Sequence, residues 1–184
     1  YFLRWSGSYN KVTHDVTVYA IWEYETTAGI EYDCPKNATY CTVSGAFKGL
    51  RGEIYVGAYH EGLKALGIED GAFEDCVAMD KVTLGNGLTS ISEGLFSGCR
   101  DLTSVTIGDS VTRIGASAFS GCTSLTSMTI PDNVTTIGDY AFYNCDSLTS
   151  VTIGDSVTAI GERAFAYCTS LTSVTIPDSV TTIG

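Results

Sequence analysis

One stretch of the chain decides its fold: Cys168-Thr-Ser-Leu-Thr-Ser-Val-Thr-Ile-Pro-Asp-Ser-Val-Thr-Thr-Ile-Gly184. It is the last copy of a unit that recurs every 23 residues, and each copy carries a cysteine at the same position. The five cysteines of this column are Cys76, Cys99, Cys122, Cys145 and Cys168. A period of about 20 to 50 residues is typical of solenoids, in which each coil packs only on its neighbours. The sequence therefore predicts a stack of coils.

Each unit predicts one short strand with a single buried face. Met128 and Ile130 alternate with Ser127 and Thr129, which is the period-2 pattern of a half-buried strand. A turn of Gly or Pro followed by Asp or Asn comes next, and a second short extended piece is expected around residues 134–137. No segment has the roughly 10 to 12 residues of helical periodicity that an ordinary helix needs. The predicted fold class is therefore a β-rich solenoid with few or no α-helices.

Two further columns complete the predicted coil. An aromatic residue closes each complete unit, and these side chains are expected in the core together with the cysteines. They are Phe96, Phe119, Phe142 and Phe165. A glycine also recurs once per unit, and we expect a positive φ angle there. These glycines are Gly115, Gly138, Gly161 and Gly184.

The composition limits the possible partners. The chain has 184 residues, with 10 Lys and Arg against 21 Asp and Glu, for a formal net charge of −11. That charge argues against nucleic acid and anionic membranes as partners. The sequence contains no apolar run of about 18 residues or more, so it predicts no transmembrane helix. The sequence shows neither a signal peptide nor an initiating Met, and its last unit stops before the Ala-Phe closure. We therefore expect a C-terminally truncated fragment of a longer protein.

The unit from Cys168 to Gly184 closely resembles the BspA-type leucine-rich repeat, and the match covers about residues 76–184. The recurring words Ala-Phe, Cys and Leu-Thr-Ser-Val-Thr-Ile carry the resemblance. The resemblance implies a curved leucine-rich-repeat array of 23-residue coils with a parallel sheet on its concave side. It also implies an extracellular bacterial protein, secreted or attached to the cell surface, of the adhesion and host-interaction kind.

Upstream of the regular units the pattern decays. Glu69-Asp-Gly-Ala-Phe73-Glu-Asp-Cys76 matches the closing part of a unit, and Ile54-Tyr-Val56 matches its strand, with extra residues between the two. We interpret residues 44–75 as a degenerate N-terminal cap, since such irregularity is expected where a repeat core meets solvent. The leucine-rich-repeat domain is thus predicted to span 44–184, with regular repeats over 76–184.

The first residues follow a different pattern. Trp5-Ser-Gly-Ser-Tyr9 and the alternating run Val12–Glu23 resemble the C-terminal half of an internalin-type B repeat, a small β module of surface proteins. Residues 1–24 are therefore predicted to be a partial B-repeat-like β segment, and residues 25–43 a linker. Two cysteines of this linker, Cys34 and Cys41, lie close together in the sequence, and a local disulfide between them is plausible in a secreted protein.

The cysteine column allows three interpretations: a metal site, a row of disulfides, or part of the core. Stacked side chains point in parallel at about 4.8 Å, so their Cβ atoms stay farther apart than the ~3.5–4.5 Å of a disulfide. No His joins the column, and Zn²⁺ needs convergent ligands rather than a row. We expect buried free thiols that act as small hydrophobes, with neither a metal nor another cofactor.

A polar face is expected on the exposed side of the predicted strands, and in leucine-rich repeats this face is the usual binding surface. Its candidate binding residues are Ser104, Thr106, Ser127, Thr129, Ser150, Thr152, Ser173 and Thr175. A solvated face of good strand residues explains the same pattern without a ligand. The rows are also similar to the Thr-x-Thr faces of β-solenoid ice-binding proteins, but a concave surface disfavours ice. They lack the aromatic and Arg anchors that are typical of interface hot spots.

The turns carry a second polar column. Its members are Asp109, Asp132, Asp155 and Asp178. Calcium between coils would relieve the repulsion of stacked carboxylates. An Asx turn that satisfies local backbone donors explains the same residues without metal, and Asn86 at the equivalent position favours that interpretation. No repeat contains a His, so no Ser-His-Asp or Cys-His set can be assembled and we predict no enzyme activity.

Variable positions near the closing loop form the second candidate site. They are Arg113, Tyr140, Tyr143, Arg163 and Tyr167. Two functions of different classes remain open. The first is non-catalytic binding of a protein or glycan ligand, of host origin in the case of adhesion, through the solenoid surface. The alternative is a passive structural spacer that displays another domain from the cell wall. Near-identical repeats favour the spacer, because a selected binding face would usually diversify.

Overall fold

The computed structural model describes residues 30–33, 40–46, 50–57, 59–60 and 63–184. The predicted B-repeat-like segment, residues 1–24, lies outside these residues. Cys34 and the side chain of Cys41 lie outside them too, so the disulfide between these cysteines stays a prediction.

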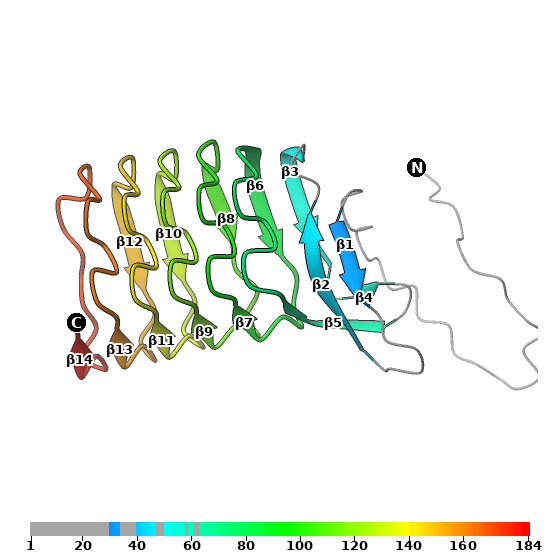
Figure 1. Ribbon diagram of the computed structural model, residues 1–184. Helices are drawn as coiled ribbons and strands as arrows, with labels where there is room; N and C mark the ends of the chain where they lie inside the picture. Colours follow the sequence, from blue (N-terminus) through cyan, green and yellow to red (C-terminus); the bar gives the residue numbers. More distant parts are fainter. Residues whose placement is uncertain (1–29, 34–39, 47–49, 58, 61–62) are drawn as a thin grey trace, which may run out of the picture.

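The repeats form a stack of coils (Figure 1). Strands of successive coils pair in parallel on two sides of the stack, longer strands on one side and shorter strands on the other. The longer strands are β6 (Ala78–Leu84), β8 (Ser104–Thr106), β10 (Ser127–Ile130) and β12 (Ser150–Ile153). The shorter strands are β7 (Ser90–Ile91), β9 (Arg113–Ile114), β11 (Thr136–Ile137), β13 (Ala159–Ile160) and β14 (Thr182–Ile183). Residues one period apart pair directly, as Met128 does with Val151. The predicted β-rich solenoid is confirmed, and the described residues contain no helix.

Parallel ladders line the side of the longer strands. Strand β3 (Arg51–Val56) pairs with β6, and β6 pairs with β8, while β10 pairs with β12 and lies beside β8. The shorter strands form one continuous sheet in the order β14-β13-β11-β9-β7. Along β10 and β12, exposed polar residues alternate with buried apolar ones, as the sequence pattern predicts. The side chains of this polar face therefore point away from the core.

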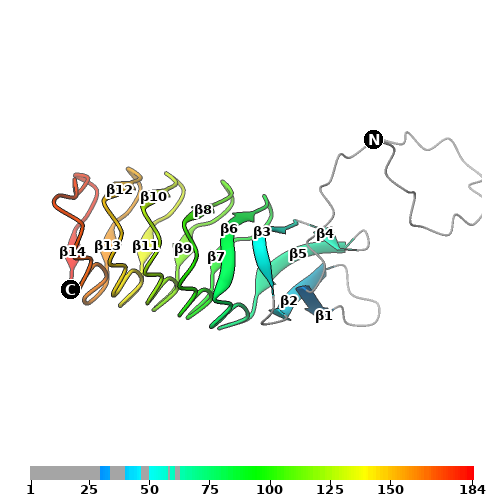
Figure 2. The ribbon, with the colours of Figure 1, turned by 90° about the horizontal axis from the view of Figure 1, so that it is seen from above.

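A mixed sheet lies at the N-terminal end of the stack (Figures 1 and 2). Its strands, in spatial order, are β1 (Ile30–Asp33), β2 (Tyr40–Ala46), β5 (Leu63–Ile68) and β4 (Tyr59–His60). Strands β2 and β5 pair in parallel, whereas the two outer pairs are antiparallel. The stretch 25–43, predicted to be a linker, thus contributes β1 and the start of β2 to this sheet. Val43 and Ile68 join the core cluster of the coils.

A ladder of aromatic rings runs through the core. It consists of Phe73, Phe96, Phe119, Phe142 and Phe165, and neighbouring ring centroids lie 5.1 to 5.4 Å apart in stacked geometry. The first four rings are buried, and Phe165 is half-buried. Each interior ring packs against the coils on both sides, so the aromatic core is a property of the stack and not of one coil.

The glycines that follow the shorter strands are required for a reason other than their φ angle. The positive φ predicted for Gly115, Gly138, Gly161 and Gly184 is wrong. A Cβ atom at Gly138 would lie 2.6 Å from the backbone nitrogen of Ala116, and one at Gly115 would lie 2.7 Å from the carbonyl carbon of Ser92. Successive coils approach so closely here that no side chain fits between them.

Candidate functional site

The exposed side of the longer strands carries two rows of hydroxyl side chains. The serine row is Ser104, Ser127 and Ser150, and the threonine row is Thr106, Thr129 and Thr152. All six side chains are exposed, and we call them the hydroxyl face. Two further predicted members, Ser173 and Thr175, are exposed but belong to no strand. They lie in the last described coil, which has a neighbouring coil on one side only.

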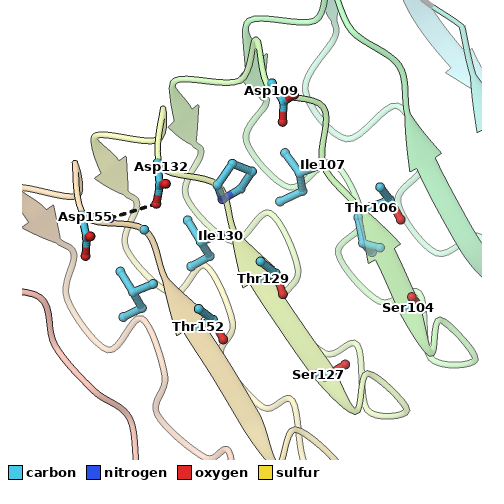
Figure 3. Close-up of a pocket in the computed structure, with 14 residues that line it drawn as sticks. Ser104, Thr106, Ile107, Asp109, Ser127, Thr129, Ile130, Asp132, Thr152 and Asp155 are labelled. Carbon is cyan, nitrogen blue, oxygen red and sulfur yellow. Dashed lines mark hydrogen bonds between the residues drawn. The ribbon is translucent and has the colours of Figure 1, made fainter.

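The hydroxyl face, apart from Ser150, lines an open cavity of about 750 Å³ (Figure 3). The cavity extends over β8, β10 and β12, and Figure 3 shows the threonine row on adjacent strands. The carboxylates of Asp109, Asp132 and Asp155 line it at the turns that follow these strands. Its lining therefore combines hydroxyls, carboxylates and isoleucine side chains.

The sequence places Lys81 and Thr83 at exposed positions of the first regular strand, but sequence reasoning missed how the two rows continue into β3. Strand pairing aligns Lys81 with Ser104 and Glu53 with Lys81, while Tyr55 extends the threonine row. Lys81 Nζ donates to Glu53 Oε1 at 2.6 Å, and this hydrogen-bonded ion pair lowers the pKa of Glu53 and raises that of Lys81. The pair is 28 residues apart instead of 23, because the stretch from β3 to β6 is longer than one regular unit. A search for the regular period therefore cannot find it.

Other threonines use their hydroxyls to join successive coils. Thr126 Oγ1 donates to the carbonyl of Thr103 at 3.4 Å, and Thr135 Oγ1 donates to that of Thr112 at 3.1 Å. The same bond recurs along both columns, from Thr103, Thr126 and Thr149 and from Thr112, Thr135, Thr158 and Thr181. The hydroxyl face makes no such bond with any described residue. Its hydroxyls are therefore free to bind solvent or a ligand.

Asp132 of the aspartate column and Asn86 at the equivalent position also join coils. The backbone N–H of Asp155 donates to Asp132 Oδ1 at 3.2 Å (Figure 3), and that of Asp109 donates to Asn86 Oδ1 at 3.2 Å. At Asp132 and Asn86 the predicted Asx turn is corrected, because each bond reaches the next coil and not a donor within its own turn. Over the ranges that the structure describes, no three His, Cys, Asp or Glu side chains are grouped to hold a metal ion.

The cysteine column is buried, and none of its thiols forms a disulfide with another described residue. Cys122 Sγ donates to the carbonyl of Phe96 at 3.2 Å, and Cys99, Cys145 and Cys168 make the equivalent bond. The backbone N–H of Cys99 binds the same Phe96 carbonyl at 3.1 Å, so the thiol of the next coil uses its second lone pair. Burial raises the pKa of Cys122 to about 12. These thiols are hydrogen-bonded links between coils, beyond the small hydrophobes that the sequence predicts.

Four of the five variable side chains gather into one cluster. The ring of Tyr143 lies edge-on to Tyr140, at 5.6 Å and 62°, and to Tyr167, at 5.1 Å and 72°. The guanidinium carbon of Arg163 lies 6.0 Å from the Tyr140 ring centroid. We call these four residues the tyrosine patch. Arg113 is not part of it, because it lies on β9 in the sheet of the shorter strands.

Comparison with known proteins places this architecture among bacterial repeat proteins. The family model described as BspA type Leucine rich repeat region matches residues 67–184 in six copies. A leucine-rich repeat protein from T. pallidum is similar, with a TM-score of 0.77 and 26% identity over 88% of this chain and 82% of that one. A leucine-rich repeat protein from Bacteroides ovatus has a TM-score of 0.62 and 26% identity, over 87% of this chain and 49% of that one.

A leucine rich cell surface protein from Faecalibacterium prausnitzii is also similar, with a TM-score of 0.59 and 27% identity over 92% of this chain and 51% of that one. The chain thus spans about half the length of the Bacteroides and Faecalibacterium proteins. No protein of curated function matches it. None of the described segments forms a helix long and apolar enough to cross a membrane.

Proposed function

Because the chain belongs to the BspA-type leucine-rich repeat family, we propose that it is a non-catalytic binding module of a bacterial cell-surface or secreted protein. Its ligand is a glycan, and its binding site is the hydroxyl face on β8, β10 and β12. A location at the cell surface is supported by the similar protein from Faecalibacterium prausnitzii, which is described as a leucine rich cell surface protein.

The observation that carries this proposal is the different use of identical side chains. Thr126 and Thr129 belong to the same coil, yet Thr126 binds the preceding coil and Thr129 faces the open cavity without a partner in the described chain. Stacking explains why threonine recurs in the column of Thr126. It does not explain the row of Thr129, whose hydroxyls make no contact between coils. A ligand that binds these hydroxyls explains the second row.

The chemistry of the cavity favours a glycan. Hydroxyl groups both donate and accept hydrogen bonds, so the lining can pair with sugar hydroxyls in either direction. Neighbouring strands lie about 4.8 Å apart, so the same pair of hydroxyls recurs at regular intervals, as a polymer of repeated units requires. The described lining has no aromatic or Arg side chain of the kind that anchors protein interfaces. The net charge of −11 selects against anionic glycans.

Removal of the hydroxyls with retention of side-chain shape tests the proposal. In the combined variant Thr106→Val, Thr129→Val and Thr152→Val, we expect binding of neutral oligosaccharides to weaken by about tenfold or more. Hexamers of glucose, mannose and N-acetylglucosamine serve as probes in isothermal titration calorimetry. The matched control is Thr126→Val with Thr149→Val, which removes hydroxyls that join coils. This control should lose stability and keep its affinity.

The alternative function is a passive spacer that displays another domain from the cell wall. A spacer needs only regular stacking, which the near-identical repeats supply. It predicts no saturable binding to any of the hexamers. Binding of equal strength to the face variant and the control variant would likewise exclude the hydroxyl face as the site.

A further inference from the structure

We infer that the tyrosine patch, formed by Tyr140, Tyr143, Arg163 and Tyr167, is a second binding surface that docks a protein segment rich in lysine and arginine. The patch lies on the closing turns of two neighbouring coils, and none of its residues lines the cavity of the hydroxyl face. The inference is independent of the glycan proposal, because the two surfaces share no residue.

The patch presents aromatic rings to solvent in a fixed arrangement. Tyr167 is 63% exposed and the Arg163 side chain is 61% exposed, while Tyr140 and Tyr143 are half-buried. Edge-to-face contacts link the three rings across the two coils and favour one relative orientation. Tyrosine and arginine are the residue types that dominate the energy of protein interfaces. The composition of the patch is therefore that of an interface anchor.

The backbone beneath the patch is strained. Tyr140, Arg163 and Tyr167 have φ angles of 56°, 51° and 59°, in the left-handed region that bulky residues avoid. The equivalent positions upstream also have positive φ and carry smaller residues: Gly94 and Ser117 in one column, Gly121 and Asn144 in the other. Glycine adopts this conformation without steric cost, so the turn itself does not explain the large side chains. Strain of this kind concentrates at functional sites.

The patch is also held rigid from behind. The backbone N–H of Tyr140 donates to the carbonyl of Glu162 at 2.8 Å, and the carbonyl of Tyr143 accepts an amide of the preceding coil at 2.8 Å. Below the turn, the rings of Phe142 and Phe165 stack at 5.2 Å. Tyrosines that are fixed before binding lose little conformational freedom when a partner docks.

Charge determines the kind of partner. A Glu162 carboxylate oxygen accepts a hydrogen bond from the Tyr140 hydroxyl at 3.5 Å and lies 3.6 Å from Arg163 Nε, so the charge of Arg163 is compensated. Asp139 is exposed on the same turn as Tyr140, accepts a hydrogen bond from the backbone N–H of Glu162 at 2.7 Å, and adds a second carboxylate beside the patch. Lysine and arginine side chains are attracted both to carboxylates and to the faces of tyrosine rings. The net charge of −11 steers basic segments toward the molecule as a whole.

The test removes the rings without any change in charge. The combined variant Tyr140→Ser, Tyr143→Ser and Tyr167→Gly installs the residues that equivalent positions carry upstream, which are Ser117, Ser120 and Gly121. The probe is a fluorescein-labelled peptide of repeated Arg-Gly-Ser units, and its binding is measured by fluorescence anisotropy. We expect saturable binding to the unmodified chain and binding weaker by about tenfold or more to the variant. A peptide of repeated Glu-Gly-Ser units should bind neither protein.

The unchanged charge makes the outcomes distinct. Equal affinity of the two proteins for the basic peptide would show that net charge alone attracts it and would overturn the inference. So would the absence of saturable binding, or a neutral oligosaccharide that binds through the rings where the basic peptide does not. The single variant Tyr143→Ser, at a position without a positive φ, guards against misfolding of the triple variant and should also weaken binding. Binding of the sugar hexamers at the hydroxyl face should not change in either variant.

Discussion

Two threonines three positions apart in one coil have opposite roles. Thr126 and Thr129 are both exposed, and threonine recurs at both positions in the coils from Thr103 onward. The hydroxyl of Thr126 binds the carbonyl of Thr103 in the preceding coil, whereas that of Thr129 points into an open cavity. The comparison shows that repetition of a residue type does not identify its role. The partner of its polar atom does.

The same distinction changes the meaning of the near-identical repeats. A coil that donates from a threonine or a thiol needs an acceptor at the matching place of the coil before it. Close approach at Gly138 imposes a further match between neighbours. Stacking therefore accounts for the recurrence of threonine, cysteine and glycine at these positions, whether or not the array binds a ligand. Near-identity at the positions that join coils is therefore no argument for a passive spacer. Only the residues of the hydroxyl face and the tyrosine patch bear on the question of binding.

The largest expected effect lies in the column that packs most deeply between coils. Phe119 is fully buried, and its ring lies 5.4 Å from that of Phe96 and 5.1 Å from that of Phe142. Phe119→Ala should lower the free energy of unfolding by about 3–5 kcal/mol, because it leaves a cavity between two coils. Urea denaturation followed by circular dichroism measures the loss.

The control for this variant is the half-buried member of the same ladder. Phe165→Ala should have a smaller effect, since Phe165 keeps part of its surface in water. Equal losses for the two variants would mean that burial between coils does not set the contribution of a ring. Residues packed between coils would then contribute no more to the free energy of unfolding than residues that face solvent.

Much of the fold could be predicted from the sequence because periodicity encodes it directly. The alternation around Met128 predicted a strand with one buried face, and β10 has it. The role of Gly138 could not be predicted from the sequence. A recurring glycine looks the same there whether it allows a close approach between coils or a positive φ angle. Tyr55 was missed as an extension of the threonine row for a related reason. The stretch from β3 to β6 is longer than one regular unit and removes Tyr55 from the regular spacing.

The candidate sites were predicted only as sets of residues. Periodicity places Ser127 and Thr129 on one outward face, but it does not show that their hydroxyls lack partners. It also groups Arg113 with Tyr140 and Tyr167 because all three vary, although Arg113 lies on another side of the coil. Hydrogen bonds between coils depend on distances across the stack, which the order of residues along one coil does not contain.

An intermediate effect is expected from the cysteine column as pH rises. Burial raises the pKa of Cys122 to about 12, so the folded chain keeps a proton that the unfolded chain loses above about pH 9. Stability is fully present below that pH and should fall above it, by about 1.4 kcal/mol per pH unit for each such thiol. Urea titrations between about pH 8.5 and 10 measure the slope.

Cys122→Ala isolates this thiol from tyrosine and lysine, which titrate in the same range. The variant should be less stable at neutral pH, because it loses the bond to Phe96, and its stability should fall less steeply with pH. An unchanged slope would show that the thiol is not protected in the folded chain. Rapid native-state alkylation of Cys122 would lead to the same conclusion.

The smallest expected effect tests the comparison of the two threonines directly. Thr126→Val removes a hydrogen bond between coils and should lower the free energy of unfolding by about 0.5–1 kcal/mol. Thr129→Val removes a hydroxyl without a partner in the described chain, and valine suits a strand as well as threonine does, so stability should change by less than about 0.5 kcal/mol. Both substitutions keep a β-branched side chain on the same coil, so urea midpoints can be compared without correction for shape. If the two variants lose the same stability, Thr129 also has a structural role, and the argument for a ligand at the hydroxyl face fails. If only Thr126→Val loses stability, the threonine row is not needed for stacking and its repetition requires another cause.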